Sequence, residues 1–263
     1  MFGDAESYER YMGRWSRLLA PRFVEFAELP AQGRMLDVGS GTGSLTFAIA
    51  ARHPRACVTG IDPSPEYVAY AASGNSSSDR VSFEVGDAEH LRFPMASFDA
   101  ALSCLVFNFI PDPKAALREF RRVTKPGGTV AVAVWDYGDG MRMLRHFWDA
   151  AARVEPSAGE LHEAHMRFCR SGVLPALWRE AGLEQVSEQP IEITMRFASL
   201  ADYWDPFLLG QGPAGAYLRH LDSDQLQAVR SEVMHRLSLA AEDMPFDLPA
   251  RAWAVRGTVP DRG

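Results

Sequence analysis

The chain has 263 residues, enough for one large α/β domain with a sizeable buried core, and two independent folds are not required. Its formal net charge of −7 argues against a nucleic-acid partner, because proteins that bind polyphosphates need a basic surface. The three cysteines are too few and too scattered for a disulfide framework, so a reducing, cytoplasmic setting is expected.

The chain begins with an acidic, polar segment over residues 1–10, so we expect no secretory signal peptide. No apolar run reaches the roughly 18 to 20 residues that span a bilayer, and no membrane partner is expected. Residues 5–29 are predicted to be helical because apolar side chains recur at spacings of three and four, with Pro21 splitting the helix.

From residue 34 onward, short apolar runs alternate with amphipathic stretches, which is the pattern of βαβ units and a parallel sheet. Strands are predicted at residues 34–38, 57–61, 81–85, 98–103, 129–135, 184–197 and 250–257. Helices are predicted at residues 44–52, 64–73, 112–123, 174–182 and 199–239, with further helix within 136–170. Asp112 and Pro113 should open the third of these helices, and Lys125-Pro126-Gly127-Gly128 should follow its end.

The first motif is a glycine-rich turn, Asp37-Val38-Gly39-Ser40-Gly41-Thr42-Gly43, between a strand and a helix. Glycines are needed where a ligand touches backbone, since a Cβ would collide with it. A dinucleotide turn would place its third glycine at position 44, where Ser44 stands, so the spacing favours a nucleoside ligand without a pyrophosphate. No Gly-Lys-Ser/Thr follows, which excludes a P-loop. The alternative is a bare strand-to-helix turn.

The second and third motifs stand at the ends of the next two predicted strands. Asp62 can accept both ribose hydroxyls, and Pro63 defines the turn after it; alternatively Asp62 caps the next helix, as Ser64 also could. Asp87 can accept from an adenine amino group, while a backbone N–H near Ala88 can donate to a ring nitrogen. Alone, this third motif is a common turn. It indicates a nucleoside site only together with the order and spacing of all three motifs.

Together these motifs resemble the class I S-adenosylmethionine-dependent methyltransferases, in the branch similar to ubiquinone and menaquinone biosynthesis C-methyltransferases. The resemblance extends through Phe98-Asp99-Ala100-Ala101-Leu102-Ser103, Pro111-Asp112, Leu117-Arg118-Glu119 and Val123 to Gly128. It implies an α/β, Rossmann-like fold with a seven-stranded, mostly parallel sheet and helices on both faces. It also implies one domain over 1–263, with a helical lid at 1–33, a cofactor-binding core at 34–135, and substrate-side insertions at 136–170 and 199–245, after the fifth and sixth strands.

The resemblance also implies site residues for S-adenosylmethionine. Asp62 would hold the ribose, Asp87 and Ala88 the adenine, and Asp37 the methionine end, often through water. The methionine end would also meet Gly39, Gly41 and Gly43, and the backbone at Ser103 and Cys104 would face the sulfonium. The family's frequent cysteine is Ser40 here, which changes little because backbone makes the contacts.

The segment from Tyr8 to Trp15 resembles the N-terminal lid helix of related enzymes, whose aromatic side chains close over the cofactor. Tyr11 and Trp15 are therefore candidate cofactor contacts. The alternative is that the helix packs through its aromatic stripe. This alternative needs no ligand.

The two insertions should emerge beside the carboxyl ends of the strands, where open α/β sheets bind ligands. Their aromatic side chains predict an apolar pocket for a hydrophobic or aromatic small molecule. These residues are Phe147, Trp148, Phe168, Tyr203, Trp204, Phe207 and Tyr217. The alternative is that they form the core of the insertions themselves.

Methyl transfer is an in-line displacement, so positioning and desolvation supply most of the acceleration. An acceptor that loses a proton still benefits from a base, and the candidates are His146, His165 and Asp136, ahead of His162 and Asp139. Each histidine could instead be a surface residue, and Asp136 could cap a turn. The pair His162-x-x-His165 lacks the further ligands that zinc needs, so no metal is expected.

The sequence thus predicts a methyltransferase that alkylates an O, N or C atom of a small molecule and leaves S-adenosylhomocysteine. The alternative is a protein that binds the cofactor without methylating, as a cyclase or isomerase, or as a non-catalytic partner or sensor. Either a monomer or a homodimer is compatible with the sequence, and the identity of the acceptor is not encoded in any motif.

Overall fold

A computed structural model describes residues 4–75 and 79–261 of the chain. It divides into two compact units, which are described separately below. The first unit consists of Met1–Arg14, Trp135–Met166 and Glu192–Arg251, and the second of Trp15–Val134, Arg167–Ile191 and Ala252–Gly263. The organisation of 1–263 as one domain with a lid, a core and two insertions stays a prediction.

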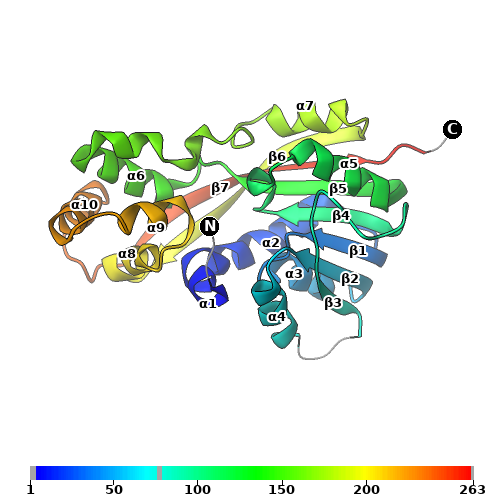
Figure 1. Cartoon of the computed structure of the whole chain (residues 1–263), viewed down its shortest axis with the longest axis horizontal. Coiled ribbons are helices and arrows are strands. Elements are labelled where there is room, and N and C mark those ends of the chain that lie inside the picture. The colour runs from blue at the N-terminus through cyan, green and yellow to red at the C-terminus, as the bar shows by residue number, and fades with distance from the viewer. Residues whose placement is uncertain (1–3, 76–78, 262–263) are drawn as a thin grey trace. The chain divides into compact units, whose positions relative to one another are not determined.

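Seven strands form one sheet in the order β3-β2-β1-β4-β5-β7-β6 (Figure 1). They are β1 (Gln32–Val38), β2 (Arg55–Asp62), β3 (Val81–Val85), β4 (Phe98–Cys104), β5 (Thr124–Trp135), β6 (Glu184–Phe197) and β7 (Phe246–Thr258). The pairs β1·β2, β1·β4, β2·β3 and β4·β5 are parallel. Strand β7 runs against β5, because Val259 N donates to Gly128 O in the second unit and Asp136 N to Arg251 O in the first. The mostly parallel sheet is confirmed.

The helices lie largely between the strands, as the alternating pattern predicted. The second unit holds α2 (Arg14–Ala27), α3 (Ser44–Arg52), α4 (Pro65–Ser73), α5 (Pro113–Val123), α7 (Val173–Glu180) and a short 3-10 turn at Phe107–Phe109. The first residue of α2, Arg14, is assigned to the first unit. The first unit holds α1 (Ala5–Tyr8), a π-helical turn at Glu9–Gly13, α6 (Arg142–Val154), 3-10 turns at Pro156–Glu160 and Glu163–His165, α8 (Leu200–Leu208), α9 (Gly212–Leu218) and α10 (Ser223–Arg236).

The alternation of side chains along β1 shows that helices cover both faces of the sheet in the second unit. Leu36 and Val38 join an apolar core that includes residues of α5 and α7. Asp37, between them, must point to the opposite face. There it accepts a hydrogen bond from Thr46 of α3. The carboxyl end of β1 therefore lies between two helical layers, next to β4, where the strand order reverses and α/β sheets bind ligands.

Helix α5 begins and ends where the sequence predicted. Asp112 is the N-cap, and its side chain accepts from Ala115 N at 2.9 Å, with Pro113 in the first turn. The helix ends at Val123, directly before the residues that start β5. Both boundaries are confirmed.

The predicted break at Pro21 is wrong, because α2 continues through it from Arg14 to Ala27. Pro21 is exposed, so the carbonyl that loses its helical partner can bond to water, while buried neighbours such as Phe23 and Val24 hold the helix in place. The irregularity lies earlier, in the π-helical turn Glu9–Gly13.

The predicted helical stretch at 199–239 is three helices, α8, α9 and α10. Gly210 and Gly212 adopt positive φ angles of 75° and 64°, which interrupts the first two. Asp222 and Gln225 form a reciprocal capping box that starts the third. Across the described residues, no helix is both long enough and apolar enough to cross a bilayer.

Candidate functional site

The glycine turn joins β1 to α3 at the carboxyl end of the sheet in the second unit. Gly39 N and Ser40 N both donate to Ile61 O, at 2.8 Å each, which ties the turn to the end of β2. A Cβ added at Gly43 would lie 2.6 Å from the Phe47 ring, so packing alone requires glycine there. A Cβ added at Gly41 would meet nothing within 4 Å. Gly41 therefore borders open space, as a ligand-facing glycine should.

Asp62 links the glycine turn to the turn after β2. Its Oδ2 accepts from Gly41 N and its Oδ1 from Ser64 N, each at 2.9 Å. The side chain that caps α4 is Ser64, which accepts from Tyr67 N, so the helix-capping alternative for Asp62 is wrong. Burial raises the pKa of Asp62, and its bonds from Ser64 and Gly41 act in the opposite direction.

Asp37 is fully buried at the end of β1. Its Oδ2 accepts from Thr46 Oγ1 at 2.7 Å, while its Oδ1 has no hydrogen-bond partner within the described residues. Burial raises the pKa of Asp37 to about 7, and the nearby charge of Asp62 adds to this increase. A buried carboxylate with one unused oxygen favours a ligand that brings a hydrogen-bond donor or a positive charge.

The end of β4 lies beside Asp37. Ser103 is buried, and its Oγ has no hydrogen-bond partner in the described part of the chain. The pKa of the Cys104 thiol is raised, first by burial and then by the charge of Asp37. Cys104 is therefore a neutral thiol at physiological pH and is unsuited to act as a nucleophile.

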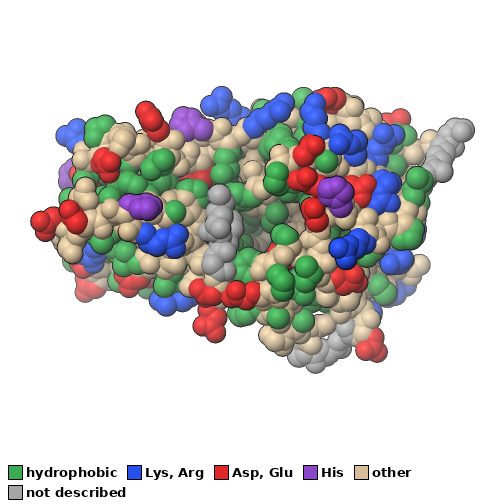
Figure 2. Space-filling view, in the orientation of Figure 1, with side chains coloured by type: hydrophobic (Ala, Val, Ile, Leu, Met, Phe, Trp, Pro, Cys, Tyr) green, Lys and Arg blue, Asp and Glu red, His purple; other side chains and the backbone are tan. Residues whose placement is uncertain are grey.

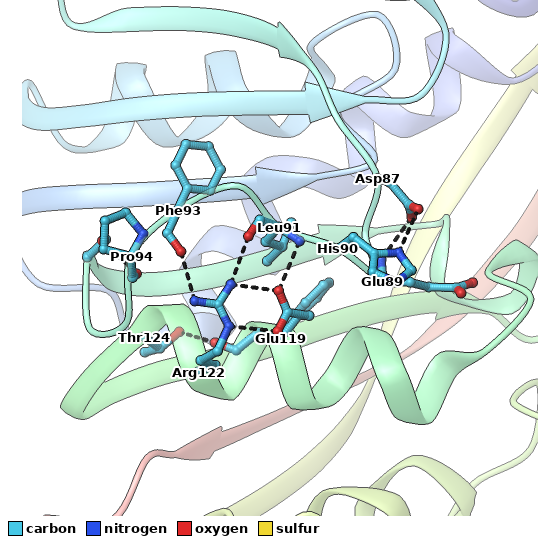
Figure 3. Close-up of polar contacts among 11 residues, drawn as sticks. Asp87, Glu89, His90, Leu91, Phe93, Pro94, Glu119, Arg122 and Thr124 are labelled. Atoms are coloured by element: carbon cyan, nitrogen blue, oxygen red, sulfur yellow. Dashed lines mark hydrogen bonds and ion pairs between the residues drawn. The ribbon is translucent and has the colours of Figure 1, made fainter.

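The turn after β3 carries Asp87 (Figure 3), whose side chain is largely exposed. Its Oδ1 accepts from Glu89 N at 2.9 Å, and its Oδ2 lies 3.2 Å from His90 Nδ1. These bonds lower the pKa of Asp87. Gly86 N donates to Asp62 O, which joins this turn to the end of β2, and Ala88 packs against the core. The carboxylate thus organises its own turn, and its contact with adenine stays a prediction.

The three candidate bases all belong to the first unit. Asp136 is buried and accepts from Arg251 Nη2 at 2.6 Å and from Arg251 Nε at 2.8 Å. His146 is half-buried on α6, and burial, followed by Arg142 and Arg236, lowers its pKa. His165 is exposed and stacks on His162, with ring centroids 4.5 Å apart. No hydrogen bond, ion pair or ring contact joins any two of the three candidates within the described residues, and their role as bases stays a prediction.

Residues 36–132 match a family described as a methyltransferase domain. The malonyl-[acyl-carrier protein] O-methyltransferase of Geobacter sulfurreducens is 34% identical over 185 residues, which are 70% of this chain and 67% of that protein. This chain belongs to the class I S-adenosylmethionine-dependent methyltransferases. It is an enzyme of this family, and S-adenosylmethionine is its cofactor.

One further relative supports this assignment, and one solved structure shares the fold. The ubiquinone/menaquinone biosynthesis C-methyltransferase of Geotalea daltonii is 36% identical to the methyltransferase over 122 residues, 45% of this chain and 50% of that one. The structure of Haemonchus contortus phosphoethanolamine N-methyltransferase 2 with S-adenosyl-L-methionine covers 98% of this chain and 57% of its own, with a TM-score of 0.59 and 18% identity. That likeness shows the fold. The methyltransferase spans only 38% to 50% of several of its curated relatives.

The predicted lid residues of the methyltransferase fall in different units. Tyr11, in the first unit, is buried and meets the edge of the Phe207 ring at a centroid distance of 5.3 Å. Trp15, in the second unit, is buried in α2. The packed aromatic stripe is therefore present, and contact of either residue with the cofactor stays a prediction.

The aromatic side chains of the two insertions mostly pack together in the first unit of the methyltransferase. Phe147 stacks on Phe207 with centroids 4.5 Å apart, and Trp148 lies 5.7 Å from Tyr217. Phe168 instead belongs to the second unit, where its ring lies 5.4 Å from that of Phe107. These contacts give the aromatic side chains a structural role that is independent of any substrate.

One buried acid in this cluster was not predicted from the sequence. Glu163 is 5% exposed and accepts from Trp148 Nε1 at 2.6 Å. Burial raises its pKa to about 7, and its charge acts on the hydroxyl of Tyr11, whose pKa rises mainly through burial. Glutamate in a polar segment is usually exposed, so nothing in the sequence indicated that Glu163 is buried. The only signal near it was the pair of candidate histidines, His162 and His165. Among the described residues, no three His, Cys, Asp or Glu side chains are grouped to hold a metal.

Proposed function

We propose that this methyltransferase binds S-adenosylmethionine at the carboxyl ends of β1, β2 and β4 and transfers its methyl group to a small molecule. The observation that carries the location is the environment of Asp37. Its Oδ1 has no partner within the described residues, and the neighbouring turn opens onto free space at Gly41. A ligand with a charged amino group and a bulky nucleoside satisfies both features.

Residues at the ends of β1, β2 and β3 have proposed roles in holding the cofactor. Asp37 would hold the methionine end, with the backbone of Gly39, Ser40, Gly41 and Gly43 approaching it closely. Asp62 would bind the ribose hydroxyls. It is only 7% exposed, and its side chain is fixed by hydrogen bonds from Gly41 N and Ser64 N, which supports this role. Pro63 would define that turn. Asp87 and Ala88 would face the adenine.

The bound cofactor supplies an electrophilic methyl group on its sulfonium, so the protein itself needs no nucleophile. The backbone at Ser103 and Cys104 would border that sulfonium, and the neutral Cys104 thiol would not compete for the methyl group. His146, His165 and Asp136 remain the proposed bases for an acceptor that loses a proton. The ion pair of Asp136 with Arg251 disfavours it among the three.

The proposed acceptor is a hydrophobic or aromatic small molecule. The names of relatives that act in ubiquinone and menaquinone biosynthesis support this class. A nucleic-acid acceptor is disfavoured by the net charge of −7, and basic side chains are interspersed with acidic ones on the face in Figure 2.

We also propose a cytoplasmic location and a monomeric or homodimeric state. No disulfide joins any of the three cysteines, all of which lie in the described residues, as is usual in a reducing compartment. Sedimentation velocity would distinguish the two oligomeric states.

The proposed activity is tested by mass spectrometry of acceptor mixtures incubated with S-adenosylmethionine. Quinols, phenols and aliphatic amines would be supplied separately, with and without protein. The expected result is one product heavier by a methyl group, formed together with S-adenosylhomocysteine. Cofactor binding with rearranged acceptors of unchanged mass would instead indicate a cyclase or isomerase.

A further inference from the structure

The loop between β3 and β4, residues 86–97, is bound to α5 by two side chains that the cofactor motifs do not include (Figure 3). Glu119 Oε2 accepts from Leu91 N at 2.9 Å. Arg122 donates from Nη2 to Leu91 O and from Nη1 to Phe93 O, each at 2.8 Å. Both backbone polar groups of Leu91 are therefore held by the same pair of side chains.

Glu119 and Arg122 also bind each other, at 2.7 Å from Nε to Oε1 and 2.6 Å from Nη2 to Oε2. They stand three residues apart on α5, so they share one face of the helix. Their side chains are 19% and 31% exposed, and the mutual bond lowers the pKa of Glu119 and raises that of Arg122. Only the planar guanidinium, with its several donors in fixed directions, can reach the carboxylate and two carbonyls at once.

Other bonds join the same loop to α5 at both ends. At the start of the helix, Asp112 N donates to Glu89 Oε1 at 2.9 Å. At its end, Ala96 N donates to Arg122 O and Ser97 N to Val123 O, at 2.9 and 2.8 Å. The Asp87 turn lies between these attachments and the end of β2. The turn is thus held on one side by the end of β2 and on the other by the start of α5 and the loop that α5 binds.

We propose that Glu119 and Arg122 are positioning residues for adenine recognition. They fix the loop so that the Asp87 carboxylate and the Ala88 backbone stand ready before the cofactor arrives. This inference rests on the proposed function, in which Asp87 and Ala88 face the adenine. Its physical basis is preorganisation. A loop that is already ordered in the free protein loses no conformational entropy when the cofactor binds, so the binding free energy is not reduced by ordering it.

The test compares calorimetric binding of S-adenosylhomocysteine with that of S-inosylhomocysteine, in which the adenine amino group is replaced by a carbonyl oxygen. The variants are Arg122→Ala and Glu119→Gln. The matched control is Arg121→Ala, because Arg121 lies on the same helix and also donates to a backbone carbonyl, that of Ala181, but not to this loop. Hydrogen exchange at the Leu91 amide reports loop order without any ligand.

We expect Arg122→Ala to weaken S-adenosylhomocysteine binding by about tenfold and to reduce the preference for adenine over hypoxanthine. Exchange at Leu91 should accelerate, and Arg121→Ala should change none of these quantities. Unchanged affinity, or an equal loss for both ligands, would overturn the inference. If Arg122→Ala fails to fold, Glu119→Gln decides in the same way. If wild-type protein binds neither ligand, or binds both equally, the proposed adenine site fails, and the inference fails with it.

Discussion

Thr46 Oγ1 donates a 2.7 Å hydrogen bond to Asp37 Oδ2, while the other oxygen of this buried carboxylate meets no partner within the described residues. Hydrogen bonds from the side chain and the backbone of Thr46 lower the pKa of Asp37, but they do not compensate for the removal of a charged carboxylate from water. Burial therefore raises this pKa to about 7. A positively charged ligand at Oδ1 would favour the ionised form.

Cofactor binding should therefore strengthen as pH rises through the pKa of Asp37. The affinity for S-adenosylhomocysteine should increase between about pH 6 and 7.5, a range in which the α-ammonium group of this free amino acid stays protonated. Asp37→Asn should bind more weakly and show a flat profile over this range. Calorimetry at several pH values checks this, and an unchanged profile in the variant would assign the titration to another group.

Gly41 and Gly43 should respond differently to the same substitution. Gly41→Ala should fold with a cost of about 1 kcal/mol from its positive φ of 52°, but should lose most cofactor affinity because its methyl group enters the open space. Gly43→Ala should lose stability more strongly, because its Cβ would meet Phe47 at 2.6 Å. Urea denaturation measures the stability of both variants, and calorimetry measures their affinity for the cofactor. Normal binding by Gly41→Ala would place the ligand elsewhere.

The ion pair between Asp136 and Arg251 should contribute to the stability of the first unit. Removal of Arg251 leaves a carboxylate that is 6% exposed without its charged partner, so Arg251→Ala should lower the free energy of unfolding by about 2 kcal/mol. The control is Arg196→Ala, which breaks the exposed pair with Asp247 in the same unit and should have little effect. Equal losses in the two variants would contradict this account of Asp136.

Glu163 should make stability depend on pH in the opposite sense from an ordinary ion-paired acid. Its pKa is raised by burial to about 7, so the folded state holds a proton that the unfolded state releases above its ordinary value of 4.5. The stabilisation from the protonated Glu163 carboxyl is complete below about pH 4.5 and is lost as the pH rises to about 7. Above that pH, the free energy of unfolding no longer depends on this group. Glu163→Gln, which can still accept from Trp148, should be the more stable protein at pH 8. The exposed Glu160→Gln is the control, and a destabilised Glu163→Gln at pH 8 would indicate a bound positive partner.

The sheet and the glycine turn could be predicted from the sequence because their signals are local. Apolar runs of strand length, the glycines after β1 and the Asp112-Pro113 helix start each act over a few residues. The break predicted at Pro21 failed because its cost depends on exposure, and that residue faces solvent.

Features that depend on partners distant in sequence could not be predicted. The burial of Glu163 depends on Trp148, and the bonds of Arg122 to Leu91 and Phe93 join residues 31 and 29 positions apart. Phe168 likewise packs with Phe107 rather than with the other insertion aromatics. Periodicity indicates that such side chains are amphipathic or apolar, but not which surface they meet.

Calorimetric titration with S-adenosylhomocysteine measures whether the cofactor binds at the glycine turn and Asp62. Wild-type protein and the Asp79→Ala control, which changes an exposed acid near β3, should bind equally. Asp62→Ala should bind at least about tenfold more weakly, because it loses hydrogen bonds to a charged acceptor. Equal affinity in all three proteins, or no binding by the wild type, would contradict cofactor binding at this site.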